Sequence, residues 1–433
     1  MFRPTLIQVY EYDRLVVGKE YEAEGRIVKF RQSHLDTLAK YITANQGCQF
    51  YTLYYDRVKF NQFVGVIQVD DLTIEVLPKT DRHDTKNKER WQQALIQMLH
   101  ISLQVEAKTT TTASINIKKL NVLEAYLVLF LEEVSKLMRV GLVKKYRNNI
   151  SNQTSLKGRV LVHQHVTRNI VHAERFYVNH QVYDRDNIYN SILREALDCI
   201  NQLSVSSVVR NKCSTILLDF PQCRNVSISE KLFSQLRYDR KTRAYKTAIQ
   251  LAKIILLNYH PDLKGGRNNI LAIMVDMNLL WENYIYFSLK KSCNRSDRKI
   301  RVHPQQKRPF WQHSNSWPLK LKPDLFVEGI YEGRPGRFIL DTKWKYQSKP
   351  SVEDIRQMYA YNQFFETEQS YLLYPDKLED SGVTKHPGDF YRPGTNRADS
   401  GLKCGLMYAD LMDEDGKLNL DIGLGIIDCL FCP

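Results

Sequence analysis

The sequence predicts an α/β protein whose C-terminal part contains a mixed central sheet, preceded by a β-rich N-terminal domain and a mostly helical middle region. Strand-like runs with alternating apolar positions are concentrated in residues 1–107, and long segments of helical period fill most of residues 108–265. Residues 266–433 combine helix-like with strand-like runs, as in a sheet covered by helices. With 433 residues, the chain is long enough for three domains with these boundaries.

The N-terminal domain begins with about 80 residues of strand-like sequence. Residues 63–78, FVGVIQVDDLTIEVLP, predict a hairpin with Asp70 and Asp71 at its turn. The apolar residues that alternate on either side of that turn are Val64, Val66, Ile74 and Val76. The charged residues 79–90 then predict an exposed connection, and residues 91–103 predict a helix.

The middle region opens with a polar run, residues 108–119, that predicts a linker or an exposed loop. Residues 121–147 are apolar over most of a helical surface and predict one long, buried helix. Gly158 introduces a predicted short strand with His163 and His165 on one face. We interpret both histidines as structural, because no carboxylate or cysteine stands at ligand spacing beside them. Two further helical stretches follow, residues 183–203 and 228–256.

The C-terminal domain is organised around residues 319–346, two strand-like runs joined by a glycine-rich turn. Alternation along the first run, LKLKPDLFV, places Asp324 on its polar face with Lys320 and Lys322. Alternation along the second run, RFILDTKWKY, places Asp341 and Lys343 on one face. If the two runs pair, these acidic and basic side chains converge on one patch.

Two carboxylates beside a lysine are suited to phosphodiester chemistry. Carboxylate oxygens bind Mg²⁺, with Mn²⁺ as an alternative ion, and an adjacent ammonium can position water or offset negative charge in the transition state. The sequence Pro323-Asp324, followed by Asp341-Thr342-Lys343, is the PD-(D/E)xK pattern of metal-dependent nucleases. Both halves of the pattern are short, so an ordinary surface hairpin is the alternative interpretation.

The segments on either side of this hairpin favour the nuclease interpretation. Upstream, residues 275–291 predict a helix that carries Glu282 beside an apolar stripe. Downstream, Ser351 is a capping-type residue before a predicted helix on which Gln357 and Tyr361 share a face. An acidic helix, two strands and a Gln/Tyr helix follow in the order of the nuclease core. We expect Asp324, Asp341 and the Thr342 carbonyl to hold the metal ion, with Glu282 as a further or water-mediated ligand.

The chain is strongly basic, with 62 Lys and Arg against 48 Asp and Glu, a net charge of +14. Such a charge favours a polyanionic partner such as DNA, although each basic cluster alone is equally consistent with a solvated helix face. No apolar run is long enough to span a membrane and no signal peptide is evident, so we expect a cytoplasmic location.

Eight scattered cysteines are typical of reduced thiols. Four of them, Cys293, Cys404, Cys429 and Cys432, flank the hairpin loosely in the manner of an iron–sulfur site, an alternative that we leave open. The sequence contains no G-x-x-x-x-G-K-[ST] motif, so a nucleotide-driven activity would need a motor on another subunit.

Six stretches resemble the McrC subunit family of McrBC-type modification-dependent restriction endonucleases, including the McrC-like subunits of LlaJI-type systems. In chain order they are FVGVIQVDDLTIEVLPKT, SLKGRVLV, YDRDNIYNSILREAL, VDMNLLWENYIYFSL, LKPDLFV and FILDTKWKY. The tail from about Pro375 matches least. The resemblance implies an endonuclease subunit that acts on double-stranded, methylcytosine-type modified DNA in complex with a McrB-like AAA+ GTPase hexamer. The partner, and not this chain, binds GTP.

The resemblance also implies roles for individual residues. Asp324 and Asp341 match the metal ligands, Lys343 matches the catalytic lysine, and Glu282 matches the acidic position of the preceding helix. Gln357 and Tyr361 match the auxiliary helix pattern. McrC-like chains dock their N-terminal part into the ring and stimulate its GTP hydrolysis, so we assign residues 1–107 to ring binding. Two rivals remain: a stand-alone DNA repair nuclease with the same core, and a non-catalytic activator of a ring NTPase.

Overall fold

The computed structural model divides into two compact units. The arm unit comprises residues 1–4 and 123–273, and the sheet unit comprises residues 5–122 and 274–433. The structure describes residues 5–23, 26–44, 47–69, 72–78, 88–102, 121–203, 206–260, 270–295, 299–314, 316–331, 334–345, 349–376, 382–391, 394, 398–413 and 415–431. None of the helices in these ranges is both long and apolar enough to cross a membrane. The predicted linker at residues 108–119 lies outside the described residues.

The N-terminal part of the sheet unit contains the predicted hairpin. Strand β7 (Phe63–Val69) pairs antiparallel with β8 (Leu72–Leu77), and β1 (Thr5–Tyr10) lies parallel to β8. Every side chain of β8 is buried, since both faces of the strand are covered. The hairpin is therefore confirmed, while its turn residues Asp70 and Asp71 lie outside the described residues. The helix predicted for residues 91–103 is α2 (Lys88–Ser102).

Smaller elements complete this region. Strands β2 (Arg14–Val16), β6 (Arg57–Phe60) and β5 (Tyr51–Leu53) form a three-stranded sheet, and β3 (Glu20–Ala23) pairs with β4 (Arg26–Lys29). Helix α1 (Gln32–Ala44) was not among the predicted elements. Its buried residues Leu35, Leu38 and Tyr41 recur every three positions, which is a helical signal.

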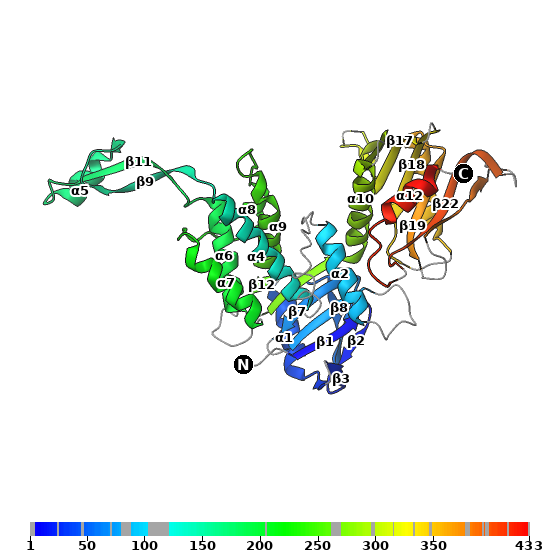
Figure 1. The fold of residues 1–433 in the computed structure, drawn as a ribbon, viewed down its shortest axis with the longest axis horizontal. Helices are drawn as coiled ribbons and strands as arrows, with labels where there is room; N and C mark the ends of the chain where they lie inside the picture. The colour runs from blue at the N-terminus through cyan, green and yellow to red at the C-terminus, as the bar shows by residue number, and fades with distance from the viewer. Residues whose placement is uncertain are drawn as a thin grey trace. The chain divides into compact units, whose positions relative to one another are not determined.

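The C-terminal part of the sheet unit is a seven-stranded mixed sheet, which confirms the predicted α/β class with a mixed sheet (Figure 1). Its main path runs β14 (Lys299–Pro304), β17 (Leu325–Tyr331), β18 (Arg334–Thr342), β19 (Gln369–Asp376), β22 (Ala398–Asp410) and β20 (Val383–His386), with β21 (Asp389–Tyr391) on β22. The neighbours from β14 to β18 are antiparallel, and those from β18 to β22 are parallel.

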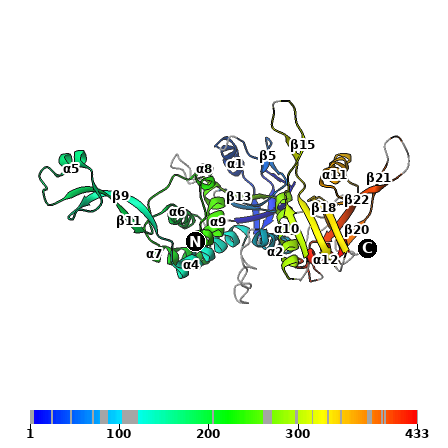
Figure 2. The same cartoon turned by 90° about the horizontal axis from the view of Figure 1, so that it is seen from above.

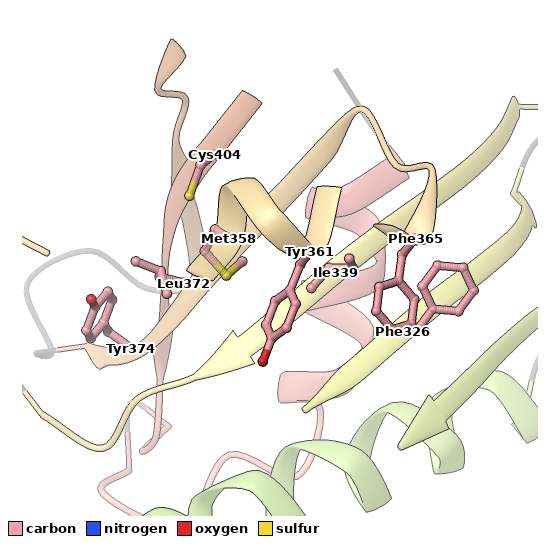
Figure 3. Close-up of a cluster of buried hydrophobic side chains, with 8 residues drawn as sticks. All are labelled: Phe326, Ile339, Met358, Tyr361, Phe365, Leu372, Tyr374 and Cys404. Atoms are coloured by element: carbon pink, nitrogen blue, oxygen red, sulfur yellow. The ribbon is translucent and has the colours of Figure 1, made fainter. Parts of the chain in front are cut away.

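Helices cover both faces of this sheet. Phe338 of β18 packs against Phe431 of α12 (Ile422–Phe431), and α12 packs against α10 (Met277–Arg295). The next residue, Ile339, points to the opposite face, as strand geometry requires, and lies in the core beneath α11 (Val352–Phe365). Figure 3 shows this core, in which Met358, Tyr361 and Phe365 of α11 meet side chains of the sheet.

One predicted strand is in fact two. The run LKLKPDLFV was expected to be continuous, but residues 319–321 form β16 (Leu319–Leu321), which pairs with β15 (Arg308–Trp311), and the chain enters β17 only at Leu325. Pro323 between them has no N–H to contribute to a ladder, which accounts for the break.

The arm unit consists mainly of helices. They are α4 (Val122–Val140), α6 (Ile188–Gln202), α7 (Ser207–Asp219), α8 (Glu230–Ser234) and α9 (Lys246–Leu257). The single helix predicted for residues 121–147 is wrong at its end, because Gly141 takes a φ of 101° and closes α4 by bonding to the Leu137 carbonyl. The stretch at 228–256 is likewise interrupted by irregular chain and the 3-10 turn η1 (Arg243–Tyr245).

A long two-stranded arm extends from these helices (Figure 1). Strands β9 (Lys145–Gln153) and β11 (Phe176–Asp184) pair antiparallel, and β10 (Arg159–Val160) and α5 (Val162–Asn169) lie near the arm's end. His163 and His165 therefore sit on a helix, not on the predicted strand. The ring of His165 accepts a hydrogen bond from the Tyr177 N–H at 3.3 Å, which is consistent with a structural role. Strand β12 (Tyr259–His260) pairs with the start of β13 (Ile270–Asp276).

Candidate active site

The hairpin of β17 and β18 brings the two motif aspartates to one edge of the sheet. Leu325 pairs with Leu340, so Asp324, one residue before, and Asp341, one residue after, lie at opposed positions. Thr342 fixes the first of them, because its N–H and its hydroxyl donate to Asp324 Oδ2 at 2.7 and 2.8 Å. These contacts come from the main-chain N–H and side chain of Thr342, while its carbonyl remains only a predicted ligand.

Glu282 joins these aspartates from helix α10. Its Oε1 accepts a hydrogen bond from Gln305 Nε2 at 2.8 Å. Burial, and then the neighbouring charges of Asp324 and, more weakly, Asp341, raise the pKa of Glu282 to about 7. The three predicted carboxylates thus lie within electrostatic reach of one another.

Asp341 is the most buried of the three, with 3% of its surface exposed. Burial and the charge of Asp324 raise the pKa of Asp341 above its ordinary value, in opposition to the nearby Lys343. Glu282 and Asp341 both have raised pKa values, and a bound cation would stabilise their ionised forms, since a cation compensates the charge that burial penalises.

The donor set fits Mg²⁺. Within the described ranges, no group of three or more His, Cys, Asp or Glu side chains lies close enough together to hold a metal ion by itself. Mg²⁺ does not need such a group, because it keeps several waters and binds through one or two carboxylates together with substrate phosphate oxygens. Asp324 and Asp341 would supply those two carboxylates, with Glu282 as a third oxygen donor.

Lys343 follows β18 directly and lies between two carboxylates. Its Nζ is 2.7 Å from Asp341 Oδ2 and 3.1 Å from Asp354 Oδ1. Burial alone would lower the pKa of Lys343, but the charges and hydrogen bonds of Asp341 and Asp354 outweigh it and raise that pKa above its usual range. The side chain is therefore a stable cation that can donate hydrogen bonds and cannot accept a proton.

Asp354 is a residue of this site that sequence reasoning missed. It occupies the first turn of α11, where Ser351 Oγ donates to its Oδ2 at 2.7 Å, and Lys345 Nζ lies 3.2 Å from that same oxygen. Burial raises the pKa of Asp354, but the hydrogen bonds from Ser351 and Lys343 outweigh burial and lower this pKa to about 2. Its place after a capping serine was sufficient to explain an acidic residue there, so only the fold reveals its contact with Lys343.

Gln357 and Tyr361 tie helix α11 to the segment that carries Asp324. Gln357 Nε2 donates to the Tyr361 hydroxyl at 2.6 Å, and that hydroxyl donates to the Lys322 carbonyl at 3.0 Å. The predicted shared face is therefore present. Through these hydrogen bonds, both side chains support the Lys322–Asp324 segment.

The chain beyond Lys343 is anchored as well. Trp344 Nε1 donates to Oε1 of the buried Glu11 at 2.7 Å, and the Trp344 ring lies 5.7 Å from that of Trp281 on α10. These contacts fix Trp344, the residue that follows Lys343 in the chain. The N-terminal residues thus contribute directly to the rigidity of the site.

The cysteine alternative gains no support from the described residues. Cys404 packs in the core beneath α11, and burial raises the pKa of its thiol to about 11, which keeps it protonated. Cys293 and Cys429 are half-buried, and Cys432 lies outside the described residues.

The raised pKa of Glu282 predicts a pH-dependent stability. A raised carboxyl pKa stabilises the fold fully below the unfolded value of about 4.5, and this stability is lost as the pH rises through about 7. The shift corresponds to about 3 kcal/mol for a fully shielded group, and solvent screening of this half-buried side chain reduces it to about 1–2 kcal/mol. In EDTA, Glu282→Gln should therefore melt higher than the native chain at pH 8, with a smaller advantage at pH 5. Equal differences at both pH values would contradict the electrostatic cause.

Known proteins were compared with the chain and its fold. Residues 58–375 match the family described as McrBC 5-methylcytosine restriction system component. A search of curated proteins gave no match.

Two solved structures from Thermococcus gammatolerans are similar. One is a half-complex from a tetradecameric assembly of McrB AAA+ hexamers with bound McrC, with 18% identity and a TM-score of 0.64 over 98% of this chain and 99% of the other. The second is the McrBC complex, with 19% identity and a TM-score of 0.48 over 66% of this chain and 88% of the other. The first likeness shows a shared fold along nearly the whole chain, and the family match spans most of it. The chain belongs to the family of the McrBC 5-methylcytosine restriction system component.

Proposed function

We propose that this chain is the DNA endonuclease subunit of a modification-dependent restriction system, which cuts phosphodiesters with Mg²⁺ and stimulates the GTPase of a McrB-like AAA+ partner. The observation that carries the nuclease proposal is the meeting of Asp324, Asp341 and a cationic Lys343 at one sheet edge. Family membership supports the restriction context.

The mechanism assigns a distinct task to each side chain. Asp324 and Asp341 would hold Mg²⁺, with Glu282 and the Thr342 carbonyl as further ligands. When bound, the ion neutralises phosphate charge and lowers the pKa of water. Lys343 donates hydrogen bonds to the attacking water or to a phosphate oxygen, which orients the reactants and offsets the charge that develops. In this proposal Lys343 acts as a hydrogen-bond donor and not as the general base, since its ammonium lies beside two carboxylates.

Asp354 holds that ammonium in place. Its carboxylate is anchored by Ser351 and stays ionised, so Lys343 remains attracted to it whether or not Asp341 is engaged with a metal ion. Contacts with both carboxylates restrict the lysine to a position beside Asp341.

The partner proposal rests on the structural neighbour, which contains McrB hexamers with bound McrC. Residues 1–107 remain our predicted ring-binding region. The arm offers a second contact surface, since exposed apolar side chains gather near its end on and around α5. These residues are Leu156, Val162, Val166, Ile170 and Val171.

The experiment measures Mg²⁺-dependent cleavage of methylated and unmethylated duplex DNA by the chain alone and with a McrB-like GTPase plus GTP. We expect cleavage only with partner, GTP and methylated DNA, and its loss in Lys343→Ala. An Ile170→Asp/Val171→Asp arm variant should lower partner GTPase stimulation if the arm contacts the ring.

The rival functions give different results in the same experiment. A stand-alone repair nuclease would cut without partner or GTP, which would keep the site and discard the partner. A non-catalytic activator would stimulate GTP hydrolysis without any cleavage that depends on Lys343, which would discard the nuclease site.

A further inference from the structure

A two-stranded ribbon stands directly beside the candidate site. Strand β15 (Arg308–Trp311) pairs antiparallel with β16 (Leu319–Leu321), from Arg308 opposite Leu321 to Trp311 opposite Leu319. Figure 2 shows that the hairpin containing β15 extends beyond the neighbouring strands. The ribbon is a separate two-stranded sheet and adds nothing to the ladder of the seven-stranded one. Its length is therefore not explained by the pairing of the main sheet.

Large apolar side chains of the ribbon face solvent. Phe310 is 47% exposed, Trp311 is 54% exposed and Trp317, in the connection between the strands, is 93% exposed. Tryptophan is costly to expose, and a group of such residues on one projecting element marks a contact surface. Aromatic faces are also the groups on which nucleic acid bases stack or against which thymine methyl groups pack.

The charge of the ribbon selects the class of partner. Residues 305–322 contain Lys307, Arg308, Lys320 and Lys322, and no Asp or Glu. Lys307, Lys320 and Lys322 are exposed. A basic and aromatic ribbon without acidic residues is complementary to a polyanion with apolar surfaces between its charges, which describes DNA. An apolar protein partner would leave these lysines uncompensated.

Both strands of the ribbon are fastened at its base to the catalytic residues or their supports. Before β15, the Gln305 N–H donates to the Asp324 carbonyl at 2.8 Å, and the Gln305 side chain donates to Glu282. After β16, the Lys322 carbonyl accepts a hydrogen bond from Tyr361. Any DNA that the ribbon binds is therefore held at a defined distance from Asp324.

A further contact steadies the ribbon from the side. Arg308 Nη1 donates to the Phe364 carbonyl of α11 at 2.8 Å, and the rings of Phe310 and Phe364 meet edge to face with centroids 5.1 Å apart. Helix α11 is the same helix that supplies Asp354 and Tyr361. The ribbon and Asp354, which holds Lys343, are thus both supported by helix α11.

We propose that the β15–β16 ribbon binds the major groove of duplex DNA next to the phosphodiester to be cut, with its lysines on the phosphates and Trp311 and Trp317 against base edges. The inference rests on the proposed nuclease function, which supplies the duplex. At about 3.3 Å per residue, the four residues of β15 span roughly 13 Å. A major groove about 12 Å wide admits a two-stranded ribbon of this kind.

The test is duplex affinity of the full chain in EDTA, measured by fluorescence anisotropy of a labelled 30-base-pair DNA. We expect Trp311→Ala/Trp317→Ala to weaken binding at least tenfold, and Lys320→Glu, an exposed charge reversal that leaves the core intact, to weaken it similarly. Tyr391→Ala removes an exposed aromatic side chain elsewhere in the sheet unit and should leave affinity unchanged. Melting temperatures of all variants establish that they are folded.

Protection of guanine N7 from methylation by dimethyl sulfate shows whether the ribbon occupies the major groove. Protection by the native chain that is lost in the tryptophan variant supports the proposal, because N7 lies in the major groove. Native affinity and native protection in both ribbon variants would overturn it. So would a ribbon variant that keeps its DNA affinity but no longer binds the AAA+ partner, since the ribbon would then be a protein contact.

Cleavage separates this inference from the proposed function. If the assembled native complex cuts DNA and the ribbon variants cut it equally well at limiting DNA concentration, the ribbon assignment fails and the nuclease proposal stands. If the native complex does not cut at all, but the ribbon variants bind duplex tenfold more weakly, the nuclease proposal fails and the ribbon remains a DNA-binding element.

Discussion

Replacing Asp341 by Asn is expected to reduce Mg²⁺-dependent DNA cleavage by the assembled complex about 1,000-fold or more, because a metal ion contributes several kcal/mol of transition-state stabilisation. Asn keeps the size of the side chain but loses the charge that would bind the ion. It also leaves Lys343 with Asp354 as its remaining anionic anchor. The measurement is the single-turnover cleavage rate with saturating Mg²⁺, partner and GTP.

The same variant should retain its fold and its effect on the partner. Asp341 is buried with a raised pKa, so removing its charge relieves repulsion from Asp324 and should not lower the melting temperature in EDTA at pH 8. Stimulation of the partner's GTPase should remain near the native value. Cleavage within tenfold of native would exclude Asp341 from the metal site, and lost stimulation would show a wider structural role.

The hairpin that unites Asp324 and Asp341 was predictable, because strand alternation and a glycine-rich turn are local properties of the sequence. The helix that begins after Ser351 was predictable for the same reason, and Ser351 does accept the hydrogen bond from the Asp354 N–H. Local signals also predicted the Gln357 and Tyr361 pair. Its target, the Lys322 carbonyl, is 39 residues away and was not visible in the sequence.

The errors occurred where a local pattern fits two structures. The run VLVHQHV, residues 160–166, alternates like a strand, yet from Val162 it forms α5, in which Val162 and Val166 lie one turn apart and exposed. The apolar run that begins at residue 121 did not indicate where its helix ends, and the structure shows that Gly141, with a positive φ, ends it. The ribbon was missed because LKLKPDLFV alternates across Pro323 as if it were one strand.

Asp354→Asn is expected to lower the cleavage rate about 10- to 100-fold, the usual cost of losing a residue that orients a catalytic group. The variant removes the anion that lies 3.1 Å from Lys343 Nζ, while the amide remains within hydrogen-bonding distance of Ser351. Lys343 is then held by Asp341 alone, which is the residue that a metal ion would engage. The Lys343 ammonium is then less constrained when Asp341 engages the metal ion.

A positional role for Asp354 is separable from a purely structural one. Losing its charge removes one cause of the raised pKa of Lys343. A positional role predicts that the cleavage rate of Asp354→Asn falls while its melting temperature stays near the native value. Asp354→Glu should restore part of the rate. Lys345→Met is the matched control, because it removes the other lysine from Asp354, at 3.2 Å, and leaves Lys343 in place. If Lys345→Met lowered the rate as much as Asp354→Asn, Asp354 would act through the helix start and not through Lys343.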